Sequence, residues 1–508
     1  MTGALMRVLS VAGATIYVWT FHVLYATVVT PQFEYFFFDP AADGSVELAF
    51  AAAVLPALWL PVQVSRPSQI VLWMLWGLAF VPSLLIPTYA LDIGFDGLFP
   101  LTLSISLSFV ILSLIQGLRI RDIDTPIKSM RSYQNLVLAV AVLFGSYIVL
   151  AFGVPLSLPD VANVYDVRSE FEQDVKTNAL PLSAYIVSWS GSVVNPLLML
   201  LGARSRRLSL FAAGLAIEML VYGITGHKTV LFSVALIIPI LLLLSTRARL
   251  FGLSFPVGAA ALMVAAAAWD RLTESTLATA LFVVRLIATP GLLTAAYYEF
   301  FSENVTYGLS HSILGFLGPM PYDVGPALLI GAVYFGNPAT WANANLWADG
   351  FMNFGIIGIL ASTLILGAYL VVLDAAASRR DLGVTGALAG MMAITLSNAG
   401  VLTALMSHGL ALSLILILLM PRQVETRVSA DVKPRPRTAS CDRPLRHTIR
   451  ERWSLPSVTP VIRGARGLSV GARRHWRSIT GGWRNRRNFA GGDDGLGMAH
   501  TRRDPDLQ

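Results

Sequence analysis

Long apolar runs alternate with short polar connections along most of the chain. Runs of about 18 or more apolar residues, long enough to cross a bilayer as a helix, recur from near the N-terminus to Met420. They predict about twelve spans, near 6–30, 46–64, 69–90, 98–118, 135–155, 180–203, 207–224, 229–246, 250–268, 347–372, 382–400 and 402–420. The first run is too long for a signal peptide and lacks a small-residue cleavage site, so we expect it to be retained. The pattern predicts an all-α, polytopic membrane protein.

One connection, 269–346, is much longer than the others. It contains an apolar stretch, Leu277–Ala288, which we expect Pro290-Gly291 to end, and a second helical piece, Leu292–Phe301. Gly- and Pro-rich segments follow. Broken helices at membrane depth occur only where they pack on protein or line a cavity. We therefore expect a large extracytoplasmic loop with short helices, partly embedded in the membrane.

Charge divides the chain into two regions, although its composition as a whole is 55% hydrophobic and only 13% charged. Through Met420 there are 18 Lys/Arg and 22 Asp/Glu, a net charge of −4, whereas 421–508 has 19 and 8, a net charge of +11. We interpret 1–420 as the membrane domain and 421–508 as a disordered basic tail. Anionic membrane lipid is the partner this tail favours, rather than nucleic acid.

The loops alternate in charge. Loops after even-numbered spans carry the basic residues Arg66, Arg119, Arg121, Lys128, Arg131, Arg204, Arg206, Arg207, Arg247, Arg249, Arg379 and Arg380. Loops after odd-numbered spans carry acids instead, among them Glu34, Asp39, Asp43, Asp92 and Asp96. Because Lys and Arg in short loops mark the cytoplasmic side, we expect both termini to be cytoplasmic and the acidic loops to face outward.

Two basic residues on the expected outer side break this rule. Lys228, next to His227 in the stretch "YGITGHKTV", follows Gly226 and opens a span, where a helix N-terminus attracts anions. Arg285 stands inside the apolar run "LFVVRLIA", where an arginine is costly unless paired or facing water. Arg271 lies in the same long loop as Arg285. Lys228, Arg285 and Arg271 together indicate a ligand that carries a phosphate or pyrophosphate group.

Structural explanations compete with this one. Lys228 is also placed to reach lipid headgroups, and Arg285 to pair with Glu299 or Glu303. Arg271 stands beside Asp270, as in an ordinary interfacial ion pair.

Candidates for acid–base chemistry and sugar binding lie on the same side. The acid–base candidates are Glu299, Glu303, His311, Asp323 and Asp349, of which we select His311, Glu303 and Asp349 as catalytic. Asn345, Asp349 and Asn353 are spaced four residues apart, so they share one helix face. Asn345 and the aromatic Tyr298 are candidate sugar-binding residues, although aromatic residues here also suit an interfacial belt.

Short motifs between Gly223 and Val372 resemble the Wzy-like O-antigen and oligosaccharide repeat-unit polymerases. They are "GHKT" opening a span, an arginine in an apolar segment followed by "PG…YYEFF", the large outer loop, and "NANLWADGFMNFGIIG" leading into the next span. Members often have arginine where Lys228 stands and several arginines in the loop; this chain has Arg271 and Arg285 there, and its basic tail departs from the pattern.

This resemblance implies a multi-span glycosyltransferase of the bacterial cytoplasmic membrane. It would join repeat units linked to polyprenyl pyrophosphate on the outer face, without a cofactor or metal, in the synthesis of O-antigen, capsule or exopolysaccharide. Flippase and chain-length regulator proteins are the partners it implies. The sequence has no Asp-x-Asp cluster, phosphate-binding GxxxxGK[ST] loop or HExxH motif, and its single cysteine excludes a cysteine-based metal cluster.

Three alternatives remain open from the sequence. An O-antigen ligase would use the same fold with another acceptor. A transporter or flippase of lipid-linked glycans, or of another anionic substrate, suits twelve spans, although we find no internal repeat between the halves. A non-catalytic scaffold would recruit cytoplasmic partners through the tail.

Overall fold

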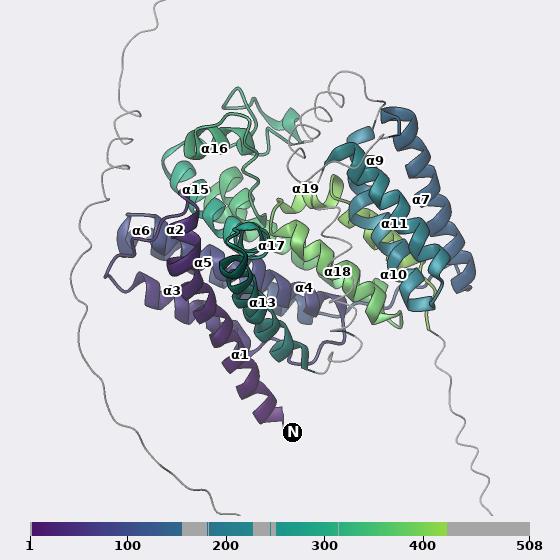
Figure 1. The fold of residues 1–508 in the computed structure, drawn as a ribbon, viewed down its shortest axis with the longest axis horizontal. Helices are drawn as coiled ribbons and strands as arrows, with labels where there is room; N and C mark the ends of the chain where they lie inside the picture. Colours follow the sequence, from purple (N-terminus) through teal and green to yellow (C-terminus); the bar gives the residue numbers. More distant parts are fainter. Residues whose placement is uncertain are drawn as a thin grey trace, which may run out of the picture. The chain divides into compact units, whose positions relative to one another are not determined.

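The computed structural model describes residues 3–154, 180, 182–226, 244, 250–312 and 314–423, all within the compact unit Met1–Arg427. Within these residues the chain is all-helical, without strands (Figure 1). The predicted span 229–246, apart from residue 244, and nearly all of the predicted tail lie outside them.

Nine helical segments of the described part are long and apolar enough to cross a membrane. They are α1 (Gly3–Leu24) with η1 (Tyr25–Val29) and α2 (Thr30–Gln32); α4 (Pro67–Leu75) with η3 (Trp76–Phe80) and α5 (Val81–Ala90); α6 (Gly94–Gly117); α7 (Met130–Phe152); α9 (Ser183–Trp189) with η4 (Ser190–Val194) and α10 (Asn195–Ser205); α11 (Leu208–Thr225); α13 (Phe251–Thr273); α14 (Leu277–Thr279) with η6 (Ala280–Ala288) and α15 (Thr289–Glu303); and α17 (Leu346–Ala377). They confirm the prediction of an all-helical membrane protein with many spans.

The remaining helices are shorter than a span needs. They are α3 (Ser45–Val54) with η2 (Leu55–Leu58), η7 (Gly315–Leu317), α16 (Pro326–Phe335), α18 (Leu382–Leu396), α19 (Val401–Met406) and α20 (Leu410–Leu419). The last two predicted spans become α18, α19 and α20, because the chain breaks at Ser397–Gly400 and again before Gly409. At 15 and 10 residues, α18 and α20 are each below the ~20 residues of a typical span.

The predicted helix break at Pro290 is wrong. The helical run continues from Leu277 to Glu303, and Pro290 lies in the first turn of α15, directly after the π-helix η6. The wider turns of a π-helix accommodate the proline ring and its missing N–H group. The predicted outer loop 269–346 therefore contains a helix of spanning length. Gly291 packs so closely on α5 that a side chain there would collide with the Pro82 carbonyl group.

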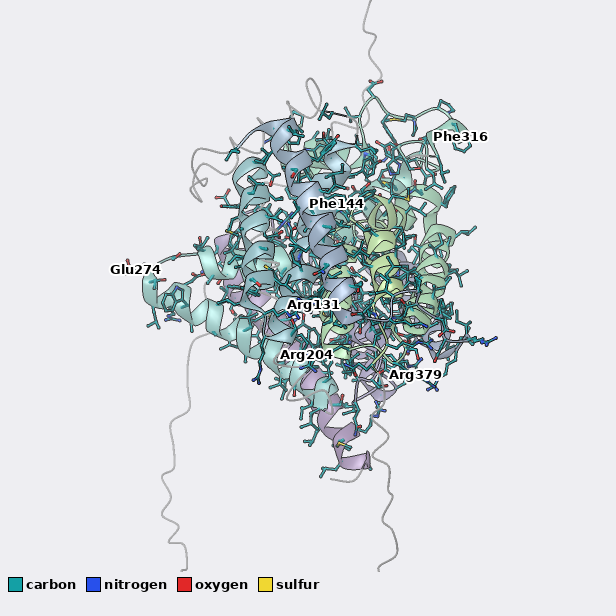
Figure 2. The ribbon with its side chains drawn as sticks, turned by 90° about the vertical axis from the view of Figure 1, so that its right-hand side faces the viewer. Arg131, Phe144, Arg204, Glu274, Phe316 and Arg379 are labelled. Atoms are coloured by element: carbon teal, nitrogen blue, oxygen red, sulfur yellow. The ribbon has the colours of Figure 1, made fainter. Side chains whose placement is uncertain are left out.

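Charged residues gather at opposite ends of the bundle. One end of the bundle, here called the basic end, brings together the connections around Arg66, Asp122, Arg204 and Asp381. There Arg204 Nε lies 2.7 Å from Asp381 Oδ2. In addition, the backbone N–H group of Ile123 donates to the Ala375 carbonyl group. Figure 2 shows Arg131, Arg204 and Arg379 in the lower half of the molecule and Phe316 near its top. The basic loops predicted to share one side thus lie together, while the direction in which they face remains a prediction.

The opposite, acidic end joins the loops around Asp39 and Asp96 to the long connection. Asp39 N donates to the Tyr89 carbonyl group, and Tyr298 Oη donates to the Gly97 carbonyl group at 2.8 Å. In the described residues, only Arg271 and Arg285 among the lysines and arginines lie away from the basic end.

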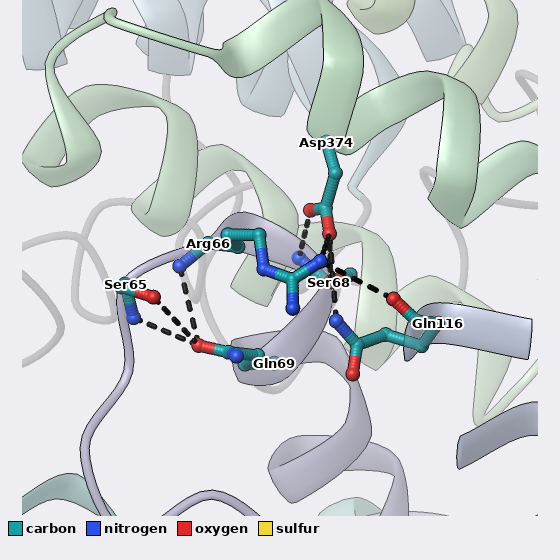
Figure 3. Close-up of polar contacts among 6 residues, drawn as sticks. All are labelled: Ser65, Arg66, Ser68, Gln69, Gln116 and Asp374. Atoms are coloured by element: carbon teal, nitrogen blue, oxygen red, sulfur yellow. Dashed lines mark hydrogen bonds and ion pairs between the residues drawn. The ribbon is translucent and has the colours of Figure 1, made fainter. Parts of the chain in front are cut away.

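A polar cluster centred on Asp374 holds the basic end together (Figure 3). Its carboxylate accepts hydrogen bonds from Ser68 N at 3.1 Å and Ser68 Oγ at 2.6 Å, and Arg66 Nη1 lies 3.2 Å from it. Gln116 Nε2, at the end of α6, reaches the same carboxylate at 3.5 Å. One carboxylate of α17 therefore joins α4 and α6.

Candidate functional site

A kink divides α17 and positions Asp349. Asn345 caps the helix, because its Oδ1 accepts from Trp347 N at 3.0 Å and Ala348 N at 3.1 Å. The helical conformation is lost at Phe354 (φ −146°, ψ 25°) and Gly355 (φ 61°, ψ −144°). The positive φ favours glycine at the second position. Residues 346–353 thus form a short first segment that carries Asp349, and the longer second segment continues to the basic end.

The Asp349 carboxyl group lies against the backbone of Gly400, which immediately precedes α19. Asp349 is half-buried, and within the described residues no donor forms a hydrogen bond or ion pair with its carboxyl group. A carboxyl group removed from water without a donor is costly, so it is rare as a purely structural feature. It is available to accept a hydrogen bond or a proton from a ligand.

We expect Gly400→Ala to impair the site. The φ of Gly400 is −62°, which alanine adopts readily, but the added methyl group would collide with the Asp349 carboxyl group. Overpacking of this kind costs about 1–3 kcal/mol. Thermal unfolding in detergent should show the loss. Gly258→Ala in α13, where the methyl group meets no atom within 4 Å, is the matched control; equal effects of the two changes would contradict this geometry.

His311 lies on a turn that is anchored to the first segment of α17. Leu309 N donates to Asn353 Oδ1 at 2.8 Å, and the ring of His311 meets the Tyr307 ring edge-on, with centroids 5.2 Å apart. Its Nδ1 is buried and has no hydrogen-bond partner among the described residues, and burial lowers the pKa of the ring. The structure thus brings Asp349 and His311, two of the predicted catalytic residues, onto two directly connected segments.

The other predicted residues of this region differ in role. Glu303, the third predicted catalytic residue, is exposed at the end of α15. Tyr298 donates to Gly97 and packs against Phe351, with ring centroids 4.9 Å apart. Asn345 is fully buried, and its Nδ2 donates to Ser83 Oγ, the Pro290 carbonyl group and Thr294 Oγ1. Tyr298 and Asn345 therefore have structural roles that require no substrate.

The predicted anion site is only partly described. Lys228 and His227 lie outside the described residues, so their distance from Arg285 is not defined. Arg285 is exposed on η6, within a segment of spanning length. Arg271 is exposed at the end of α13, while neighbouring Asp270 accepts from Ala278 N and Thr279 N and so caps the next helix.

Sequence reasoning missed two buried acids, Glu218 in the middle of α11 and Asp374 near the end of α17. The signal was visible, because a carboxylate within an apolar span is unusual. No group of three or more His, Cys, Asp or Glu residues that could hold a metal ion occurs in the described part of the chain.

No protein-family model, curated protein or solved structure matches the chain. The resemblance to Wzy-like polymerases therefore remains a prediction from short motifs, and the function has to be argued from the site.

Proposed function

We propose that this protein is a membrane glycosyltransferase that polymerises oligosaccharide repeat units linked to polyprenyl pyrophosphate, at the outer face of a bacterial cytoplasmic membrane. The observation that supports it best is the half-buried Asp349 carboxyl group, which has no hydrogen-bond donor among the described residues. The multi-span helical fold suits a lipid-linked substrate, because such a substrate keeps its polyprenyl chain in the bilayer.

In the proposed reaction, Asp349 is the general base. Its carboxylate takes the proton of an acceptor sugar hydroxyl while the hydroxyl oxygen bonds to the anomeric carbon of the donor glycan. The bond from that carbon to the pyrophosphate oxygen breaks, and polyprenyl pyrophosphate leaves with the electron pair. Arg285 and Lys228 remain the predicted partners of the leaving pyrophosphate, since cationic side chains stabilise the charge that develops there.

We expect the activity to depend on pH through His311. Its pKa is lowered by burial from the ordinary 6.5, so below pH 6.5 the unfolded turn binds more protons than the packed one. The stability of the packed turn is thus present above that pH and is lost as pH falls toward the folded-state pKa. Glycan elongation measured between about pH 5 and 8 should decline on the acid side. His311→Phe, which keeps an aromatic ring against Tyr307, should flatten the decline. If elongation by the wild type and by His311→Phe falls equally as pH is lowered, this role of His311 is refuted.

Deletion of the gene separates this proposal from the nearest alternative. Without a polymerase, single repeat units still cross the membrane, so the cell surface should carry one-unit glycans. Without a flippase, the lipid-linked units accumulate on the cytoplasmic side and the surface glycan disappears. Electrophoresis of surface glycans, with plasmid-borne wild type as the control, distinguishes the two results. Loss of all surface glycan would contradict the proposal.

A transporter is the second candidate, favoured by the discontinuous helices. α17 is kinked at Phe354–Gly355, and α18, α19 and α20, which are separated by breaks at 397–400 and 407–409, pack against it. Discontinuous helices of this kind are typical of secondary transporters. The same deletion experiment tests this candidate.

A further inference from the structure

Two arginines lie close together at the basic end, each directly beyond an apolar helix. Arg380 follows the end of α17 at Ala377, and Arg422 follows the end of α20 at Leu419. Burial lowers the pKa of Arg380, and the positive charge of Arg422 lowers it further, because like charges disfavour each other. Since α17 is long and apolar enough to cross a membrane, we expect its end, and this pair, near the level of the lipid headgroups.

Arg380 is held in place by the protein itself. Its Nε donates to the Met420 carbonyl group at 2.7 Å, its Nη2 to the Leu418 carbonyl group at 2.9 Å, and its Nη1 to the Ala376 carbonyl group. The last carbonyl groups of a helix lack backbone partners and carry partial negative charge, so Arg380 caps α17 and α20. Its side chain therefore supplies a fixed positive charge beside Arg422.

Arg422 differs, because one whole edge of its guanidinium group has no acceptor. Its Nη1 lies 2.6 Å from Asp124 Oδ1. Its Nε and Nη2 are shielded from water and have no hydrogen-bond partner among the described residues. These two N–H groups point to the same side of the guanidinium, where they form the fork that binds two oxygens of one carboxylate or phosphate. A charged donor without water or an acceptor is costly, so this edge favours an oxyanion ligand.

The surroundings of the fork leave positive charge in excess. Asp124 is 86% exposed, so water screens its charge. Asp122 is 42% exposed and lies 3.9 Å from Arg379. The Arg422 side chain is itself 23% exposed, so its guanidinium group borders the surface. The connection 118–129, which carries both aspartates, also carries three exposed basic residues: Arg119, Arg121 and Lys128.

We infer that Arg422 binds a phosphate group at the basic end, with Arg380 adding to the attraction. Two phosphate oxygens can accept from Nε and Nη2 of Arg422, and the negative charge of the phosphate offsets the repulsion between the two arginines. Anionic phospholipids present such a group at the membrane surface, and inorganic phosphate has the same chemistry. This inference does not depend on the proposed glycan polymerisation.

Thermal unfolding of the full-length protein in detergent tests this inference. Tm is measured in detergent alone, with added phosphatidylglycerol, and with inorganic phosphate replacing chloride at equal ionic strength. A ligand that binds only the folded state raises Tm, and at 100 times its Kd we expect a rise of about 3 °C for a chain of this size. A rise with phosphatidylglycerol alone assigns the phosphate to a lipid headgroup, and a rise with inorganic phosphate assigns it to the free ion as well.

Three variants separate the fork from general attraction by the basic end. Arg422→Lys keeps the charge but loses the fork, so it should remove most of the rise. Arg131→Lys makes the same change at an exposed arginine in the first turn of α7, also at the basic end, and should keep the full rise. Asp124→Asn removes a competing negative charge and should reach half of the rise at a lower ligand concentration.

Two results would overturn the inference. One is a wild-type Tm that is equal in detergent alone, with phosphatidylglycerol and with inorganic phosphate, which needs no variant to fold. The other is an equal rise in Arg422→Lys and Arg131→Lys, which would show that the basic end attracts anions through its charge and without the fork of Arg422.

Discussion

Asp349→Asn is expected to stop glycan elongation while the protein stays folded in the membrane. Asparagine has nearly the same shape, so it fits against Gly400, but its amide cannot take a proton from a sugar hydroxyl. A general base contributes about 100- to 10,000-fold to rate, so elongation should fall at least ~100-fold. Electrophoresis of glycans from cells that carry the variant measures chain length, and an epitope tag measures the amount of protein.

Asp96→Asn is the matched control, because it removes an exposed carboxylate in the first turn of α6, which the proposed site does not include. It should leave the distribution of chain lengths unchanged. A normal distribution for Asp349→Asn, or equal loss in both variants, would show that Asp349 is not the base.

The second large effect concerns stability at the basic end. Asp374→Ala removes the acceptor shared by Arg66, Ser68 and Gln116 (Figure 3). The Asp374 side chain is only 7% exposed, against 24% for Arg66. Removing one partner of a buried ion pair costs about 3–5 kcal/mol. Because Arg66 is partly solvated, we expect about 3 kcal/mol, measured as reduced resistance to chemical unfolding in detergent.

Asp122→Ala is the control for this prediction. Asp122 Oδ2 lies 3.9 Å from Arg379 Nε, and the two side chains are 42% and 63% exposed. Exposed pairs contribute about 0–1 kcal/mol, so this change should have little effect. The double change Asp374→Ala with Arg66→Ala should recover part of the loss, because it removes the unpaired charge. Equal destabilisation by Asp374→Ala and Asp122→Ala would refute the importance of this cluster.

The sequence predicted most of the helices because a span must be long and apolar whatever its neighbours are. The prediction from sequence failed where tertiary contacts determine where a helix ends. Pro290 was expected to end a helix, but the π-helix before it allows the helix to continue into α15. The breaks that shorten α18 and α20 lie at small residues such as Ser397 and Gly400, which are also common inside spans.

The candidate site was predictable only in part. Asp349 was visible as a carboxylate at the start of an apolar run. The structural role of Asn345 was not, because its partners Ser83 and Thr294 are distant in sequence. Glu218 is also a carboxylate in an apolar run, as Asp349 is, but it was overlooked. Only the structure shows its contact with Asn195. Lys228 stays a prediction, since it lies outside the described residues.

Reconstitution tests the proposed activity most directly. Purified protein in liposomes would be given polyprenyl-pyrophosphate-linked repeat units extracted from cells that lack the protein. We predict a ladder of longer lipid-linked glycans with the wild type and none with Asp349→Asn. A wild type that forms no ladder, or an Asp349→Asn variant that forms the same one, would contradict the proposed polymerase.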